Sequence, residues 1–125
     1  RSSPVADCMV PWDQIECLRE DSSDQERWDM LTDAVHSRLP VVSLDGAVRG
    51  YVHLLEVLGA PSDAGLLSHL RPLMALEPNT PIASALLRMR GGGRRMALVG
   101  TPEKPLGLVA LKDLVEEITG DVVGL

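Results

Sequence analysis

The chain lacks most features that mark secreted, membrane-spanning or disulfide-bonded proteins. Its two cysteines, Cys8 and Cys17, are nine residues apart and form no CxxC motif, so we expect no disulfide scaffold and a reducing cytoplasm. No apolar run approaches the roughly 20 residues of a membrane helix, and no signal peptide is visible. The chain starts with Arg1 and not with Met, and we therefore expect a piece of a longer protein.

Motifs for catalysis are also missing. There is no GxSxG nucleophile elbow, and the three histidines, His36, His53 and His69, are 17 and 16 residues apart without HExxH or another metal spacing. The triple glycine Gly91–Gly93 is not a phosphate loop, because no GxxxxGK[ST] is present. The sequence therefore predicts neither an enzyme nor a metal site.

The net charge of −6 argues against nucleic acid as a partner. Residues 1–33 hold nine acids and three bases, whereas residues 34–125 hold nine of each. The acidic excess thus lies wholly in the first quarter of the chain.

What the chain does have is an internal repeat. His36–Leu58 and Arg95–Val115 match without a gap at an offset of 57 residues, which pairs Arg38 with Arg95 and Gly50 with Gly107. A repeat of this length fixes the architecture before any single motif does. Glycine weakens a strand, so Gly50 predicts a close backbone approach to another strand or to a ligand.

Each copy is predicted to fold as β-α-β-β-α, which gives a mixed α+β fold. In the first copy we expect strands at Trp12–Leu18, Leu39–Leu44 and Val48–Val52, a helix capped by Ser22 or Ser23 with its apolar stripe reaching Val35, and a helix at Leu54–Leu58. In the second we expect strands at Leu73–Leu76, Arg95–Val99 and Leu106–Val109, a helix begun by Thr80-Pro81, and a helix at Leu111–Ile118 closed by Gly120.

Two units of about 60 residues are each marginal alone. We therefore expect the copies to share one core, and the separate halves 1–62 and 63–125 to be unfolded or aggregated. The last helix of each copy has an apolar face, formed by Leu54, Val57 and Leu58 in one and by Leu111, Leu114 and Val115 in the other. One pair of copies cannot cover both faces, so a two-fold dimer is predicted.

The motifs resemble a tandem cystathionine-β-synthase (CBS) pair, or Bateman module, packed from two such repeats. The resemblance is carried by Arg38–Val42 with Gly50–Val52, and by Arg95–Val99 with Gly107–Asp113. Met9–Pro11, His36–Arg38 and Leu114–Asp121 make it similar to the pair of hemolysin-C-like, magnesium/cobalt-efflux (CNNM-type) proteins. On this basis residues 9–60 are CBS repeat 1, residues 66–120 are CBS repeat 2, and residues 1–8 and 121–125 are flanking linkers.

The resemblance implies a regulatory module and not a catalyst. Such pairs bind an adenine nucleotide, ATP or AMP with or without Mg²⁺, and two pairs associate into a homodimer. In this subfamily the pair follows a membrane domain of the same chain, so the resemblance places it on the cytoplasmic side of an inner-membrane transport protein. The alternative is a structural dimerisation module with a degenerate site that binds no nucleotide.

The family motif Gly-h-h-Thr/Ser-x-x-Asp places a hydroxyl near phosphate and a carboxylate near ribose. This chain departs from it, with His53 and Glu56 in copy one, and Ala110 and Asp113 in copy two. The resemblance assigns nucleotide binding to Arg38, Leu39, Pro40, Val41, Gly107, Leu108, Ala110 and Asp113, and a second, pseudo-symmetric site to His53, Glu56, Ala97 and Leu98. Without a ligand, Asp113 and Glu56 would simply be acids that stabilise a helix start.

A run of arginines lies around the triple glycine. Arg88, Arg90, Arg94 and Arg95 follow one another with no intervening acid. They could contact a phosphate or an acidic partner. The other interpretation is a solvated helix end, where cations are favoured.

Overall fold

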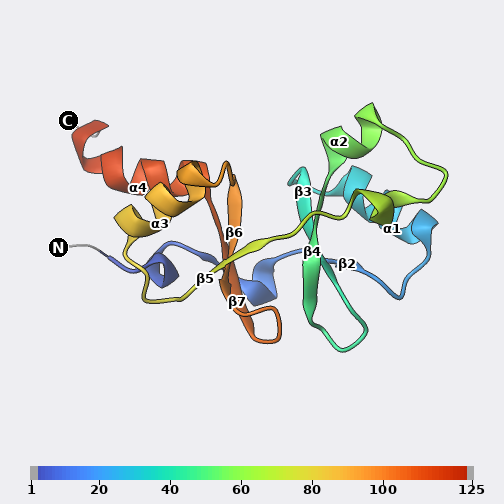
Figure 1. Ribbon diagram of the computed structural model, residues 1–125, viewed down its shortest axis with the longest axis horizontal. Helices are drawn as coiled ribbons and strands as arrows, with labels where there is room; N and C mark the ends of the chain where they lie inside the picture. The colour runs from blue at the N-terminus through green and yellow to red at the C-terminus, as the bar shows by residue number, and fades with distance from the viewer. Residues whose placement is uncertain (1–2, 124–125) are drawn as a thin grey trace. The chain divides into compact units, whose positions relative to one another are not determined.

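The computed structural model describes residues 3–123, and the side chains of residues 3–120, as two compact units (Figure 1). Residues 16–73 are called the first-repeat unit, and residues 3–15 with 74–123 the second-repeat unit. Elements in each repeat follow the order β-α-β-β-α, so the predicted mixed α/β fold class is confirmed.

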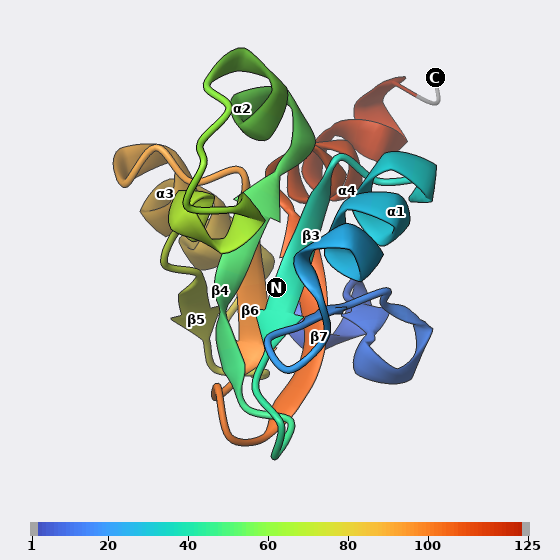
Figure 2. The same ribbon diagram turned by 90° about the vertical axis from the view of Figure 1, so that its right-hand side faces the viewer.

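The first-repeat unit is built on a three-stranded sheet. Its elements are β2 (Leu18–Arg19), α1 (Asp24–Asp33), β3 (Arg38–Val42), β4 (Val48–His53), α2 (Leu54–Gly59) and the 3₁₀ helix η3 (Leu66–His69). The strand order is β2-β3-β4, with β2 parallel to β3. Strand β4 runs antiparallel to β3 (Figure 2). As predicted, Ser23 caps α1: its hydroxyl accepts a hydrogen bond from the backbone N–H of Glu26, at 3.1 Å.

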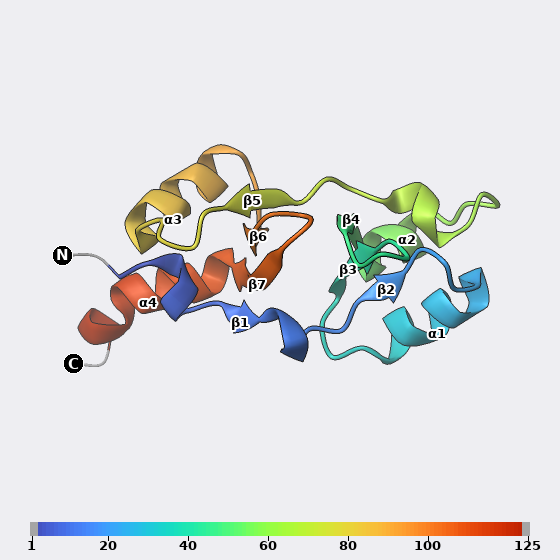
Figure 3. The same ribbon diagram turned by 90° about the horizontal axis from the view of Figure 1, so that it is seen from below.

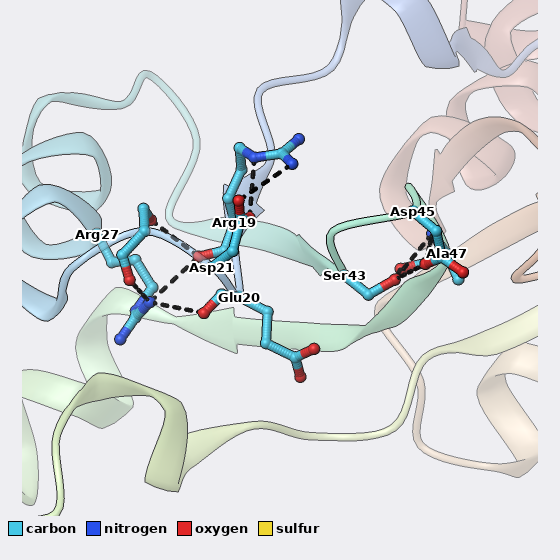
Figure 4. A network of polar contacts seen from close by, with 8 residues as sticks. Arg19, Glu20, Asp21, Arg27, Ser43, Asp45 and Ala47 are labelled. Atoms are coloured by element: carbon cyan, nitrogen blue, oxygen red, sulfur yellow. Dashed lines mark hydrogen bonds and ion pairs between the residues drawn. The ribbon is translucent and has the colours of Figure 1, made fainter.

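A polar cluster ties the start of α1 to the end of β2 (Figure 4). The guanidinium of Arg27 donates to the backbone carbonyls of Arg19 and Glu20, at 3.2 Å each, and also to that of Ser22. It lies 3.6 Å from the carboxylate of Asp24 as well, and the Arg27 side chain is only 11% exposed. The half-buried guanidinium of Arg27 thus pairs with three backbone carbonyls between the end of β2 and the start of α1.

The second-repeat unit has a four-stranded sheet with one strand from the N-terminal segment. Its elements are the 3₁₀ helices η1 (Val5–Asp7) and η2 (Trp12–Gln14), the strands β1 (Val10–Pro11), β5 (Met74–Leu76), β6 (Met96–Gly100) and β7 (Pro105–Ala110), and the helices α3 (Ile82–Gly91) and α4 (Leu111–Val123). The strand order is β1-β7-β6-β5. Helices α3 and α4 lie side by side (Figure 3).

Each unit encloses its own hydrophobic core. A further core shared by both copies stays a prediction. The first-repeat core consists of Leu18, Leu31, Leu39, Val41, Val52, Val57 and Leu66. The second-repeat core consists of Val5, Leu76, Ile82, Ala85, Met89, Ala97, Val99, Val109 and Leu114. Val57 and Leu114, which we expected on exposed helix faces, are 1% and 0% exposed.

Two segments outside the repeated β-α-β-β-α pattern complete these cores. We call residues 3–15 the first leader and residues 66–73 the second leader. Val5 of the first leader is 0% exposed, and its N–H donates to the carbonyl of Thr80 at 2.8 Å. Leu66 of the second leader is 1% exposed, and its N–H donates to the carboxylate of Asp24 at 2.9 Å. Each leader therefore supplies apolar surface that a 60-residue repeat lacks.

Several predicted boundaries need correction. Residues 3–8, predicted as a linker, pack into the second-repeat core, and residues 121–123 continue α4 through Gly120, at a cost that a long helix tolerates. Residues 1–2 and 124–125 of the predicted linkers lie outside the described residues. The limits of the two repeats, 9–60 and 66–120, stay a prediction.

Other corrections concern single elements. The strand expected at Trp12–Leu18 is reduced to β2, because a 3₁₀ turn follows Pro11. Val35 lies beyond α1 and is 91% exposed. Pro81, and not Thr80, is the N-cap of α3, and its carbonyl accepts from the N–H of Ala85 at 2.9 Å.

In the part of the chain that the structure describes, no helix is long and apolar enough to cross a membrane.

Both thiols should react slowly in the folded chain. Burial raises the pKa of Cys17 to about 11; burial and, after it, the carboxylates of Glu117 and Asp113 raise the pKa of Cys8. Since the thiolate is the nucleophile, about one Cys17 thiol in a thousand is reactive at pH 8. We expect iodoacetamide to modify Cys17 at least about tenfold more slowly than in the urea-unfolded chain, as followed by mass spectrometry. Equal rates would contradict this.

Candidate functional site

Two equivalent glycines let a leader approach the last strand of each repeat. A Cβ on Gly50 would lie 2.3 Å from the carbonyl oxygen of Arg71, and one on Gly107 would lie 2.4 Å from that of Val10. The second leader pairs with β4 through two hydrogen bonds of 2.9 Å between the backbones of Tyr51 and Arg71. The predicted close backbone approach at Gly50 is therefore confirmed.

Strands β3 and β4 bring the first group of predicted site residues together in the first-repeat unit. Arg38 is the cross-strand partner of His53, and Pro40 that of Tyr51. Leu39 and Val41 belong to the core of the unit, so their side chains face inward. What this segment offers a ligand is the half-buried side chain of Arg38.

His53, beside Arg38, contributes little positive charge. Burial, and after it the positive charge of Arg38, lowers the pKa of His53, against the opposing effect of Glu56. The lowered pKa favours the uncharged form of the imidazole. It can form hydrogen bonds there but adds little charge for a phosphate.

Glu56, at the ribose position of the motif, is already engaged. The guanidinium Nε of Arg71 lies 2.9 and 2.8 Å from its two carboxylate oxygens, and an Nη also contacts it. Hydrogen bonding to Arg71 is the main reason that the pKa of Glu56 lies below its usual value. Arg71 was not among the predicted site residues, because it lies outside the repeated motif and no pattern in the sequence marks it.

The second group of predicted residues lies in the second-repeat unit. Ala97 pairs with Val109 and Leu98 with Leu108 across β6 and β7, and both Ala97 and Leu98 are 0% exposed. Ala110, at the position of the missing hydroxyl, is half-buried and ends β7.

Asp113 differs from its counterpart Glu56. It lies in the first turn of α4, half-buried, and its carboxylate has no hydrogen bond or ion pair with any described residue. Of the two motif acids, Asp113 alone is therefore available to accept a ligand's hydroxyls.

The arginine run borders a shallow hollow of about 220 Å³ in the second-repeat unit. Arg90, Gly93, Arg94, Arg95 and Leu111 line it. Within residues 3–120 none of these guanidiniums has a carboxylate within ion-pair distance, whereas the four ion pairs found there all belong to the first-repeat unit. The hollow can therefore accept an anion.

The structure places the predicted site residues in two groups, one in each unit. Arg38, Leu39, Pro40 and Val41 lie with His53 and Glu56, while Gly107, Leu108, Ala110 and Asp113 lie with Ala97 and Leu98. That residues of both groups form one nucleotide site stays a prediction. Among the described residues no group of three His, Cys, Asp or Glu side chains could hold a metal ion.

Comparison with known proteins identifies similar chains. The family model described as "CBS domain" matches residues 67–120. The magnesium and cobalt efflux protein CorC of Vibrio cholerae is 30% identical over 94% of this chain. The protein Rv1841c of Mycobacterium tuberculosis is 37% identical over 72% of it. The chain spans only 43% and 27% of these two relatives.

Solved structures share the fold over nearly the whole chain. A CBS domain from Clostridium difficile has a TM-score of 0.82 at 25% identity, covering 96% of both chains. A CBS-domain pair from Klebsiella pneumoniae with bound AMP has a TM-score of 0.83 at 21% identity, covering 94% of this chain and 99% of that one. The two units thus correspond to the two halves of such a pair.

Proposed function

Because the chain belongs to the CBS-domain family and is a CBS pair of the kind found in magnesium and cobalt efflux proteins, we propose that it senses an adenine nucleotide and regulates a membrane ion transporter. It acts by binding and not by catalysis. In this proposal the module lies on the cytoplasmic side of the membrane, attached to a membrane domain of the same full-length chain.

The observation that carries the nucleotide proposal is the carboxylate of Asp113, which has no polar partner among the described residues and lies beside a strand that a leader backbone approaches at Gly107. An aspartate at this place can accept hydrogen bonds from both ribose hydroxyls. Neither Ala110 nor His53 offers the hydroxyl that contacts phosphate in the family motif. The phosphate groups must therefore be bound by cationic side chains. Arg38 is the proposed phosphate ligand, and the arginines of the hollow can take an anion in the same unit as Asp113.

We further propose that two modules associate as a homodimer. Support comes from apolar side chains left exposed on the last helix of each repeat. Leu55 and Leu58 of α2 are 65% and 56% exposed, and Val115 and Ile118 of α4 are 37% and 42% exposed. Pairing of such faces about a two-fold axis is the commonest way to cover them.

Replacing Asp113 by alanine should weaken binding of AMP or ATP at least about tenfold, since a hydrogen bond to a charged group contributes about 1.5–3 kcal/mol. Glu56→Ala should have a much smaller effect, because Arg71 already occupies that carboxylate. Ala110→Thr should tighten binding by restoring the phosphate contact. Titration calorimetry with AMP, ADP and ATP, with and without Mg²⁺, measures all three.

Glu116→Ala is the matched control, because it removes an exposed carboxylate from the same helix as Asp113. Equal losses for Asp113→Ala and Glu116→Ala would mean a general charge effect and no ribose site at Asp113. No binding by the wild-type chain or by any variant would favour the structural dimerisation module instead.

A further inference from the structure

Building on the proposed function, we propose that Arg71 occupies the ribose-facing carboxylate of the first repeat from within the chain, so that the module binds one nucleotide and not two. The side chain at this one leader position then decides whether a repeat's carboxylate is open. It is an arginine in the first-repeat unit and a valine in the second-repeat unit.

In the first-repeat unit, both the side chain and the backbone of Arg71 are held by hydrogen bonds. Arg71 donates from Nε to both oxygens of Glu56, at 2.9 and 2.8 Å, and an Nη donates as well. Its backbone is fixed on β4 by the two hydrogen bonds to Tyr51. The acceptors that a ribose would need are therefore taken by a donor whose main chain is anchored on β4.

The second-repeat unit provides an internal comparison. Val10 pairs with Leu108 in β7, as Arg71 pairs with Tyr51 in β4, and Leu108 and Tyr51 are equivalent at the repeat offset of 57. Asp113 follows Leu108 by five residues, as Glu56 follows Tyr51. A valine cannot donate to a carboxylate, so Asp113 stays open.

The close approaches at the two glycines support the same alignment. The carbonyl of Arg71 lies against Gly50 and that of Val10 against Gly107, and the preceding residues, Leu70 and Met9, touch the same glycines. Positions 71 and 10 are thus equivalent in three dimensions, although the repeat in the sequence does not reach them.

Exchanging the two side chains tests the proposal. Titration calorimetry of the intact chain with ATP and with AMP should give one site for wild type, two sites for Arg71→Val, and at least about tenfold weaker binding for Val10→Arg. Val10 is 43% exposed, so the larger side chain has room. Val10→Met is the control for size without charge and should bind within about threefold of wild type. Thermal unfolding of each variant verifies that it is folded.

The outcomes separate this proposal from the proposed function. Two sites in wild type, one site in Arg71→Val, or unchanged binding in Val10→Arg would overturn the role of Arg71. If wild type has two sites and Arg71→Val has lost one of them, Arg71 binds phosphate in that site. This result would also overturn the proposal that Arg71 blocks the site. Binding by Arg71→Val alone, with none by wild type, would support the role of Arg71 and overturn the site at Asp113. No binding by either chain overturns both.

Discussion

Replacing Gly50 by alanine should lower the free energy of unfolding by about 2–6 kcal/mol, a large part of the 5–15 kcal/mol of a typical domain. Two costs add. Gly50 has φ +149°, which side chains rarely adopt, and forced backbone conformations cost about 1–3 kcal/mol each. The new Cβ would also meet the backbone oxygen of Arg71, which the bridge to Tyr51 holds in place, and such overpacking costs about 1–3 kcal/mol.

The equivalent change at Gly107 separates the two costs. Its Cβ would meet the carbonyl of Val10, but its φ is not in the left-handed region, so only the overpacking cost of about 1–3 kcal/mol applies. Gly59→Ala is the control, because Gly59 ends α2 and a Cβ added there would have no other atom within 4 Å. It should change stability by less than about 0.5 kcal/mol or increase it.

Urea unfolding measures these differences, with the midpoint shifted at constant m-value. Trp28 lies in the first-repeat unit and Trp12 in the second-repeat unit, so single-tryptophan versions report on each unit. Gly50→Ala should shift the transition seen by Trp28, and Gly107→Ala the one seen by Trp12. An effect of Gly50→Ala no greater than that of Gly59→Ala would contradict the close approach.

The sequence predicts what is repeated and misses what is not. The gapless repeat gives the order of elements in both units, and an otherwise costly glycine inside a strand, Gly50, predicts the close approach. The leaders carry no repeat, so neither the place of Val5 in a core nor the contact of Arg71 with Glu56 could be foreseen. Both depend on a leader that packs against a repeat element distant in the sequence. Local sequence patterns do not encode such contacts.

The same reason explains why the candidate site was only half predicted. The motif identifies Glu56 and Asp113 as equivalent acids, and both lie in the first turn of a helix as expected. The difference between them is set by one leader residue in each unit. The spacing of apolar residues in the sequence cannot predict which residue such a side chain contacts, because an exposed arginine is compatible with any polar position.

The second leader should contribute as much to stability as a buried part of the repeat itself. Leu66→Ala should lower the free energy of unfolding of the first-repeat unit by about 2–5 kcal/mol, as is usual for a buried leucine. Leu66 is 1% exposed and packs in a core with Leu31, Val41 and Val52, although it lies outside the β-α-β-β-α elements. Leu55→Ala, at a site that is 65% exposed, is the matched control and should change stability by less than about 0.5 kcal/mol.

The place of Leu66 also gives a new reason for expecting the separate halves 1–62 and 63–125 to be unfolded. Cutting there removes Leu66 from the core of the first-repeat unit and Val5 from that of the second, even though the two cores are distinct. Residues 16–73, by contrast, keep every member of the first-repeat core, and should unfold more cooperatively in urea than residues 1–62. If Leu66→Ala costs no more than Leu55→Ala, or if residues 1–62 fold as well as residues 16–73, the leader does not complete the core.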